Sequence, residues 1–484
     1  MTEERKKQKT PRGAAVEILN RIDQQGAHAE PLLDALLSGT EIRNPQDRGL
    51  LTELVYGTLR MRGRLDWIIA QHYRGDFSSL EIPVRNILRT GIYQLFFTDR
   101  IPAFAAVNEA VGLAKKGCPA AAGLVNAILR NVLREKERIA WPEMAKDPGR
   151  AIAVLHSHPR WLVERWLDRY GIDETIAVCR ANNGIPPLAI RVNSLKTSRD
   201  KAVAALAAEG ITAETTRFSP DGILLTTPAA GLRETAAFRD GLIRVQDEAS
   251  QLVALLSAPQ AGEQALDLCA GTGGKTLHMA ALMKNQGKIT AVDLHPEKLR
   301  LLAAEADRLG VTIVETQPGN ASRTPEAFRE AFDRVLLDAP CSGLGTLRRN
   351  PEIRWRITPE DLEKCAQTQR RLLRSAALCV KPGGRLVYTT CTVTPEENEN
   401  VVADFLAGHP AFTRIAPEGI PPELIGADGF FRTFPHRHGT DGFFGAVFVR
   451  AFSIPCPAST LGRSPNPHSL PLQRTQTGQQ EHRN

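Results

Sequence analysis

One stretch of this chain decides its fold class, LDLCAGTGGKT at residues 266–276. Its first apolar residues predict a buried strand, the glycines that follow predict a tight turn, and the last residues predict the start of a helix. Glycines let the backbone approach a ligand closely, and the first turn of a helix offers unpaired N–H groups. We therefore expect a cofactor loop between this strand and this helix.

Three classes of loop compete for this pattern. A P-loop would need a glycine five residues before Gly274, where the chain has Cys269, so that class is excluded. A dinucleotide loop of the form G-x-G-x-x-G would need a third glycine where the chain has Thr276. S-adenosylmethionine carries no pyrophosphate and tolerates a different glycine pattern. Asp293 ends the next expected strand, where a carboxylate can accept hydrogen bonds from the ribose hydroxyls of either adenosine cofactor.

Strands and helices alternate after this loop. Apolar runs predict strands at 265–269, 288–293, 311–315, 334–338 and 385–390, with helices that begin near residues 275, 296 and 359. This alternation is typical of right-handed βαβ units, so we expect an α/β Rossmann-like domain with a doubly wound parallel sheet. Two last apolar runs, 442–444 and 447–449, predict a pair of antiparallel edge strands.

Two cysteines follow the expected strands most closely. Cys341 and Cys391 each come just after a run that reads as a central strand, at the sheet edge where α/β proteins place their ligands. Thiolates are strong nucleophiles, so two thiols at this edge indicate covalent chemistry. The remaining cysteines are expected to be inert packing residues; they are Cys118, Cys179, Cys269, Cys365, Cys379 and Cys456.

The chain before the cofactor loop divides into two further regions. Apolar residues at helical spacing predict an all-helical segment from Pro11 to about Glu137, with Phe104 and Leu133 on core-facing stripes. Prolines and a glycine at 141–149 then interrupt the helices, and short strand-like runs with one helix predict a small α+β module. The expected regions are a flexible start (1–9), a helical domain (10–140), a linker with the α+β module (141–245), the Rossmann-like domain (246–452) and a disordered tail (453–484).

Composition excludes several classes of protein. No apolar run approaches the ~18 residues of a membrane span, and the charged segment Met1–Thr10 lacks a signal peptide, so we expect a cytoplasmic protein without membrane contact. Eight cysteines without paired metal spacing indicate reduced thiols and no metal site. Lysine and arginine outnumber the acidic residues by 61 to 54, which suits either a nucleic-acid partner or an ordinary solvated surface.

The motifs together resemble a known family. The chain is similar to the bacterial 16S ribosomal RNA (cytosine-C5) methyltransferases, in the RsmB/Sun branch that carries an N-terminal NusB-like RNA-binding domain. The resemblance covers about residues 10 to 452 and rests on an ordered set of motifs, DLCAGTGGKT (267–276), DAPCSG (338–343), RRNPEIRW (348–355), YTTCT (388–392) and PEEN (395–398).

The resemblance implies a cofactor, a partner and roles for residues. The cofactor is S-adenosylmethionine and the partner is 16S rRNA, free or in an assembling small subunit, with the enzyme expected to be a monomer. Cys391 adds to C6 of the cytosine, Cys341 assists removal of the C5 proton and release, and Asp338 hydrogen-bonds the cytosine or the cofactor. The cofactor pocket consists of Cys269, Ala270, Gly271, Thr272, Gly273, Gly274, Lys275, Asp293, Asn320 and Asp338.

The chain departs from the family at two positions. Thr272 replaces the usual proline, and Asn320 replaces a common aspartate but keeps an amide oxygen that can accept a hydrogen bond.

Three functions other than rRNA methylation also fit parts of this sequence. DNA cytosine methyltransferases combine a Pro-Cys nucleophile with a later Glu-Asn-Val, which this chain has at Pro340-Cys341 and at 399–401, but that interpretation leaves Cys391 unexplained. The second function is methylation of tRNA or another RNA, and the third is RNA binding without catalysis by a NusB-like protein.

Overall fold

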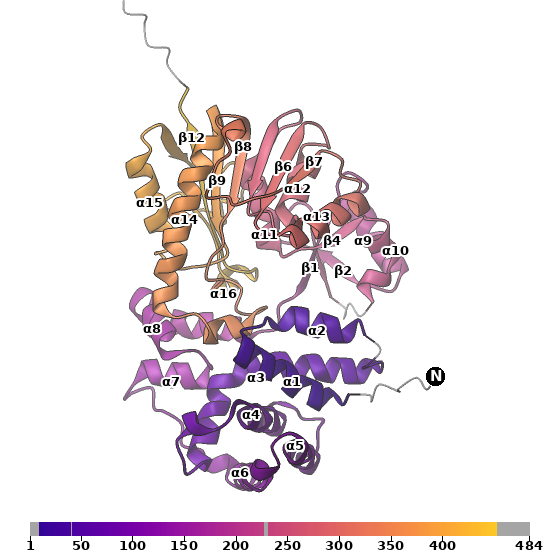
Figure 1. Cartoon of the computed structure of the whole chain (residues 1–484), viewed down its shortest axis with the longest axis vertical. Coiled ribbons are helices and arrows are strands. Elements are labelled where there is room, and N and C mark those ends of the chain that lie inside the picture. Colours follow the sequence, from indigo (N-terminus) through magenta and orange to yellow (C-terminus); the bar gives the residue numbers. More distant parts are fainter. Residues whose placement is uncertain (1–8, 40, 227–230, 453–484) are drawn as a thin grey trace, which may run out of the picture. The chain divides into compact units, whose positions relative to one another are not determined.

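The computed structural model describes residues 9–39, 41–226 and 231–452 (Figure 1). The tail expected over 453–484, and all but the last residue of the expected flexible start, lie outside the described residues. None of the helices in the described part of the chain is long and apolar enough to cross a membrane.

The first region is entirely helical. Its helices are α1 (Pro11–Gln25), α2 (Ala29–Leu37), α3 (Pro45–His72), α4 (Ile82–Phe97), α5 (Ala103–Gly117) and α6 (Ala122–Arg134). Their apolar stripes share one core, in which Val107, Val125 and Leu129 are buried as expected. Phe104 and Leu133 are exceptions, because they lie in the first turn of α5 and the last turn of α6, and they are 70% and 40% exposed.

Two helices connect this region to the rest of the chain, α7 (Pro148–Leu155) and α8 (Arg160–Asn183). The break expected at 147–149 is in fact a helix start, because the Asp147 side chain accepts a hydrogen bond from the Arg150 N–H (2.9 Å) and caps α7. Helix α8 is kinked at Gly171, whose backbone is not helical and whose φ is 76°.

A small α+β module follows, as expected. It contains β1 (Leu188–Val192), α9 (Arg199–Ala208), β2 (Ala213–Thr215), β3 (Gly222–Leu225), α10 (Ala236–Arg239) and β4 (Ile243–Val245). Its strands form an antiparallel sheet in the order β2-β3-β1-β4, and α9 packs on this sheet through Ala202 and Leu206.

The last region contains the large sheet. Its elements are α11 (Glu248–Ser257), β5 (Gln264–Leu268), α12 (Gly274–Leu282), β6 (Lys288–Asp293), α13 (Pro296–Leu309), β7 (Val314–Pro318), β8 (Phe332–Asp338), α14 (Pro359–Cys379), β9 (Val380–Thr390), α15 (Glu399–Gly408), β10 (Phe412–Ile415), β11 (Phe431–Thr433), α16 (Pro435–His438) and β12 (Phe443–Arg450). The strand order is β10-β12-β9-β8-β5-β6-β7, with β11 beside β12, and β5 to β9 are parallel. The expected doubly wound α/β fold is confirmed.

The sequence prediction of two edge strands near the end of this region is wrong. Residues 443–450 form one strand, β12, which pairs antiparallel with β9 on one side and with β10 on the other. Residues 443–448 are all buried, so the glycine and alanine between the two apolar runs do not interrupt the strand. The strand expected at 311–315 begins at Val314, because Val311 closes the end of α13 by donating to the Ala306 carbonyl (2.9 Å).

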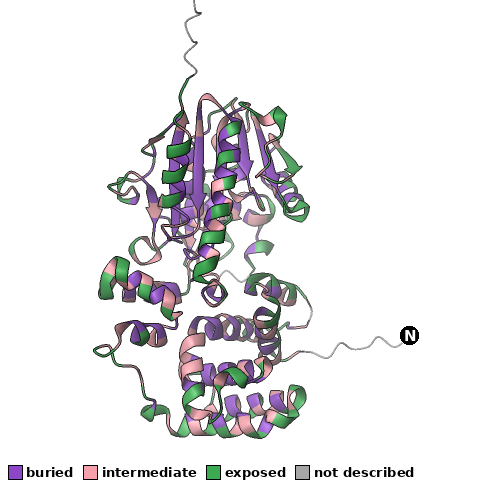
Figure 2. Ribbon diagram, turned by 60° about the vertical axis from the view of Figure 1, so that its left-hand side comes forward, coloured by how far each residue is buried: buried purple, intermediate pink, exposed green. Residues whose placement is uncertain are grey.

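Helices cover both faces of the large sheet. Helices α11, α12 and α13 pack on one face, and α14 and α15 pack on the other, so each face has its own apolar core. Figure 2 shows the strands as buried and the outer faces of the covering helices as exposed. Burial of both faces leaves the carboxyl edge of the strands as the open part of the sheet.

The segment 348–355 holds the helical region against the large sheet. The Trp355 indole donates to the Leu59 carbonyl (2.9 Å), and the Arg60 guanidinium donates to the Arg348 carbonyl (3.2 Å). Arg354 is fully buried and donates to the Asn182 carbonyl at the end of α8 (3.0 Å). This motif therefore joins three parts of the fold.

Candidate active site

The glycine loop has the expected strand-turn-helix form. It leaves β5 at Leu268 and enters α12 at Gly274. Cys269 and Gly273 both have positive φ, at 65° and 82°. A side chain at Gly273 would place a Cβ atom 2.4 Å from Leu302 Cγ, so only glycine fits there. The turn thereby brings backbone N–H groups of the α12 start to the carboxyl edge of the sheet.

Asp293 braces this loop from the neighbouring strand. It ends β6, where one carboxylate oxygen accepts the Gly271 N–H (2.8 Å) and the other accepts the His295 N–H (2.9 Å). Asn320 lies in the next turn, where Gly319 donates to the Asp293 carbonyl (3.0 Å). The Asn320 side chain is exposed, and its oxygen accepts hydrogen bonds from Ser322. The structure therefore brings three of the expected cofactor elements to adjacent strand ends.

Lys275 and Asp338 form an ion pair beside the loop. The Lys275 ammonium lies 2.6 Å from one Asp338 oxygen, and the Thr389 hydroxyl donates to the other (3.0 Å). Burial lowers the pKa of Lys275, but the charge and hydrogen bond of Asp338 outweigh it and the net pKa is raised. Lys275 is therefore charged near neutral pH, and it holds Asp338 in a fixed position at the end of β8.

Cys341 and Cys391 meet at the ends of adjacent parallel strands. Their sulfur atoms are 3.1 Å apart, although 50 residues separate them in sequence. Both side chains are half-buried. The hydrogen bond to Cys391, followed by burial, raises the pKa of the Cys341 thiol. Whichever sulfur carries a negative charge, the other can donate its S–H to it.

Gly345 keeps the loop after Cys341 close to Cys391. Its N–H donates to the Cys391 carbonyl (3.0 Å), and its carbonyl accepts the Gly442 N–H (2.8 Å). A Cβ atom on Gly345 would lie 2.0 Å from the Gly442 carbonyl oxygen. A side chain at this position would therefore push the loop after Cys341 away from the segment that contains Gly442.

A buried glutamate, Glu397, joins the two cysteine loops. Its carboxylate accepts hydrogen bonds from the Ser342 N–H (2.8 Å), the Gln369 amide (2.9 Å) and the Thr394 hydroxyl (2.9 Å). These donors come from the residue after Cys341, from α14 and from the loop after Cys391. We call this set of contacts the Glu397 brace, and it sets the separation of the two thiols.

Asn398 fixes the residues on either side of Cys391. Its side-chain oxygen accepts from the Thr390 hydroxyl (2.6 Å), and its amide nitrogen donates to the Thr392 carbonyl (3.1 Å). The sequence contains Glu397 and Asn398 in its PEEN motif, but nothing in their local pattern indicates that they contact the cysteine loops.

Most of the other cysteines are unsuited to nucleophilic chemistry. Burial raises the pKa values of Cys179 and Cys269 to about 12, and those of Cys365 and Cys379 to about 11. Deprotonation at neutral pH is therefore rare for these thiols. Cys456 lies outside the described residues.

Three family models match the chain. The model described as 16S rRNA methyltransferase RsmB/F matches residues 254–449, the NusB family model matches residues 9–134, and the Methyltr_RsmF/B-like ferredoxin-like domain matches residues 158–230. The probable ribosomal RNA small subunit methyltransferase B of Bacillus subtilis is 39% identical over 447 residues, covering 90% of this chain and 98% of that relative. The ribosomal RNA small subunit methyltransferase B of Pseudomonas syringae is 36% identical over 445 residues, covering 91% and 97%.

The chain belongs to the RsmB/F family of 16S rRNA methyltransferases.

Solved structures agree with this RsmB/F assignment. The crystal structure of PH0851 is 31% identical, has a TM-score of 0.78, and covers 90% of this chain and 98% of that one. NSun6 from Pyrococcus horikoshii, solved with SFG, is 25% identical with a TM-score of 0.56 and covers 61% and 99%. This RsmB/F protein is thus an S-adenosylmethionine-dependent rRNA methyltransferase with an N-terminal NusB domain, as its motifs predicted.

The small module supports the cofactor loop of this RsmB/F enzyme through two arginines. Arg191 is fully buried and donates to the Gly274 carbonyl (2.8 Å), while Arg244 donates to the Thr272 carbonyl (3.0 Å). Both lie on short strands whose sequence pattern predicts only burial, so sequence reasoning missed them. The module therefore supports the loop in addition to Asp293.

Asp267 is a second feature of the RsmB/F loop that the sequence did not reveal. It is buried at the end of β5, where it accepts a hydrogen bond from the Thr276 hydroxyl (2.6 Å). Burial raises the pKa of Asp267 to about 7, and its other oxygen has no hydrogen-bond partner in the described part of the chain. Within the described ranges, no group of three or more potential ligands is arranged to hold a metal ion.

Proposed function

We propose that this enzyme methylates C5 of a cytosine in 16S rRNA through a covalent intermediate. The observation that carries the proposal is the pair of thiols 3.1 Å apart, at the sheet edge that also holds the glycine loop. Cytosine C5 becomes nucleophilic only after a group adds at C6, and a thiolate is suited to that addition. A methyltransferase acting on oxygen or nitrogen would have no use for this pair.

The two thiols take different roles in this proposal. Cys391 bonds to C6, which places negative charge on C5, and C5 then takes the methyl group from the sulfonium. When Cys391 is bonded to C6 as a thioether, it carries no negative charge, so it no longer attracts the S–H of Cys341. The Cys341 thiol then gives its proton to solvent, and the resulting thiolate takes the C5 proton. The electrons of that C–H bond re-form the C5–C6 double bond as Cys391 leaves as a thiolate, which releases the RNA. The roles follow the family resemblance, and the shared position of the two sulfurs supports them.

Asp338 orients the target in this proposal. Lys275 and Thr389 hold its carboxylate, but two oxygens have about four lone-pair positions, so it can still accept a hydrogen bond from the cytosine amino group or the cofactor. The Lys275 ammonium adds a fixed positive charge at the site where negative charge develops.

We place S-adenosylmethionine at the loop formed by residues 269–275. Its adenosine lies between this loop and the strand ends that carry Asp293 and Asn320, because these groups line adjacent edges. The unpaired oxygen of Asp267 and the N–H groups at the start of α12 supply further polar contacts nearby. When bound, the cofactor supplies the methyl group.

Removal of the Asp293 carboxylate tests this placement. We expect Asp293→Ala to weaken S-adenosylmethionine binding by at least about tenfold, because each charged hydrogen bond contributes about 1.5–3 kcal/mol. Calorimetry with the cofactor measures this change. The matched control is Glu297→Ala, which removes an exposed carboxylate four residues away. Equal affinity in Asp293→Ala and the wild type would remove Asp293 from the site.

A second substitution tests the Glu397 brace. Glu397→Gln keeps the shape of the side chain but replaces one acceptor oxygen by an NH2 group, which cannot accept from the donors around it, at a cost of about 1–3 kcal/mol. We expect kcat to fall about 10- to 100-fold, while cofactor affinity stays unchanged because the glycine loop does not contact Glu397. Single-turnover methyl transfer and calorimetry measure the two quantities. Glu396→Gln, at a half-buried neighbour that pairs with Arg165, is the control; equal losses in both variants would refute a positioning role.

Sequencing of bisulfite-treated RNA tests the function itself. Cells that lack the gene are expected to lose 5-methylcytosine at one position of 16S rRNA and to regain it when the wild-type gene is restored. Loss of the mark from tRNA or DNA instead would transfer the activity to that substrate. Methylation of purified rRNA and of small subunits, compared side by side, identifies the form that the enzyme uses. We propose that it acts as a monomer in the cytoplasm.

A further inference from the structure

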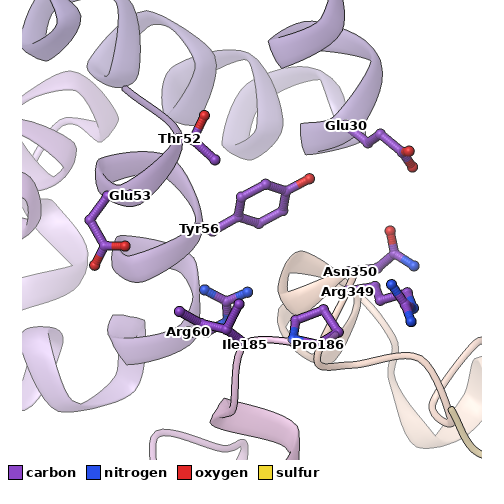
Figure 3. Close-up of a pocket in the computed structure, with 9 residues that line it drawn as sticks. All are labelled: Glu30, Thr52, Glu53, Tyr56, Arg60, Ile185, Pro186, Arg349 and Asn350. Atoms are coloured by element: carbon purple, nitrogen blue, oxygen red, sulfur yellow. The ribbon is translucent and has the colours of Figure 1, made fainter. Parts of the chain in front are cut away.

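A pocket of about 330 Å³ lies between the helical region, the linker after α8 and the segment that follows Cys341 (Figure 3). Helices α2 and α3 supply Glu30, Tyr56 and Arg60, and the linker after α8 supplies Ile185 and Pro186. Asn350, in the segment that follows Cys341, closes the opposite side. We call this space the junction pocket, and it lies apart from the residues that hold the thiols.

Tyr56, Ile185 and Pro186 give the junction pocket its apolar surface. Tyr56 projects its half-buried ring into the space, and the Arg60 guanidinium lies 5.4 Å from the centre of that ring. Ile185 is 79% exposed beside Pro186, so its apolar side chain is accessible at the edge of the pocket. A planar group that stacks on Tyr56 would cover part of this apolar surface.

Polar groups also line the pocket. Arg60 is only 8% exposed, and its guanidinium donates to the Arg348 carbonyl (3.2 Å). Glu30 makes no hydrogen bond or ion pair with the described part of the chain. Burial, followed by the charge of Glu30, raises the pKa of Tyr56, so its hydroxyl stays a neutral donor. The pocket thus offers both donors and acceptors at its edges.

The charges of the pocket do not favour a phosphate. Glu30 and Glu53 balance Arg60 and Arg349 in the lining, and Arg349 is already paired with Asp247 and Asp441, so a phosphate meets no net positive charge. An uncharged planar ring with donors and acceptors on its edge fits better, and a nucleobase is such a ring. Stacking of bases on aromatic side chains, with an arginine nearby, is a common mode of single-strand binding.

The segment that supplies Asn350 to the pocket also contacts Cys391. Arg349, next to Asn350, is held by Asp247 and Asp441 (2.7 Å each), and Gly345 of the same segment bonds to Cys391. Nine residues lead from Cys341 to Asn350, so the two lie at most about 32 Å apart. A strand of RNA whose target base reaches Cys391 therefore has neighbouring nucleotides within reach of the pocket.

We propose that the junction pocket holds an unpaired nucleobase of the substrate RNA, stacked on Tyr56, near the cytosine that is methylated. This inference rests on the proposed function for its RNA. It gives the helical region a part in substrate selection, because the base that enters must match the donors and acceptors of Arg60, Glu30 and Asn350.

The test compares Tyr56→Leu with Tyr56→Phe. Leucine keeps an apolar side chain but cannot stack, whereas phenylalanine keeps the ring. We expect Tyr56→Leu to bind an unmethylated 16S rRNA transcript about tenfold more weakly than wild type, as stacking on one base implies, and Tyr56→Phe to bind within about twofold. The dependence of affinity on salt should be unchanged, because no phosphate contact is lost.

Two further features of the experiment distinguish failure of this proposal from misfolding of the variant and from failure of the proposed function. Ile185→Ser alters an exposed side chain that the fold does not need, and we expect it to weaken RNA binding about threefold without changing cofactor affinity. Equilibrium binding needs no turnover, so an enzyme that methylates another base would still show these losses. Wild-type RNA affinity in both Tyr56→Leu and Ile185→Ser overturns the proposal, as does a reduced salt slope, which would indicate a phosphate in the pocket.

Discussion

Cys391→Ala is expected to abolish methyl transfer and to form no covalent complex with RNA. Without a thiolate at this position nothing adds to C6, so C5 stays too weakly nucleophilic to attack the sulfonium methyl. Deletion of a covalent nucleophile costs about 10⁴-fold or more in rate. Transfer of labelled methyl groups to unmethylated 16S rRNA measures the activity, and denaturing gel electrophoresis detects any protein–RNA adduct.

The control for this variant is Cys118→Ala, which removes a half-buried thiol at the end of α5, in the helical region. It should retain wild-type activity. An adduct in Cys391→Ala would move the nucleophile to Cys341 and restore the Pro-Cys mechanism of the DNA enzymes. Full activity in Cys391→Ala would refute covalent catalysis by this thiol.

Cys341→Ala is expected to stop at a later step of the reaction than Cys391→Ala. Cys391 can still add to C6 and the methyl group can still transfer, but loss of the C5 proton is no longer assisted. The enzyme should therefore accumulate as a methylated protein–RNA adduct that survives denaturation, with multiple turnover reduced by about 10²- to 10⁴-fold, the contribution typical of an acid–base group. A radiolabelled methyl group in the shifted gel band identifies this species.

Mapping of the adduct checks the assignment of the bond. Mass spectrometry should find the modified nucleotide on the peptide that contains Cys391, and the double variant Cys341→Ala/Cys391→Ala should form no adduct. Wild-type turnover in Cys341→Ala would show that another group removes the proton. An adduct on any other cysteine would contradict the roles given to the pair.

The local pattern of the sequence predicted much of the fold. The run Leu266–Leu268, the glycines after it and the start of α12 carry the information for a strand-turn-helix unit within a dozen residues, because burial period and turn chemistry act locally. The same holds for the amphipathic helices of the first region. Phe104 and Leu133 lie on the apolar stripes of their helices but outside the core, since the ends of a helix extend beyond the surface that it packs against.

Pairing between strands was less predictable. The two apolar runs in residues 442–449 suggested a pair of antiparallel edge strands, but they form one interior strand, β12. A run of apolar residues indicates burial and not the identity of its neighbours, and β12 finds its partners, β9 and β10, only when the whole sheet assembles. The motif at 348–355 likewise gave no local sign that Arg354 and Trp355 join the helical region to the sheet.

The sequence by itself determined the strand-turn-helix form of the glycine loop, the alternation of strands and helices, and the placement of two thiols after two strands. Only the tertiary structure decided that those thiols lie 3.1 Å apart, that Glu397 bonds to the loops of both, and that Tyr56 faces Asn350 across a pocket. The reason is physical. Periodicity and turn residues encode the conformation of a short segment, whereas contacts between residues 50 or 300 positions apart depend on strand order and on how helices pack over the assembled sheet.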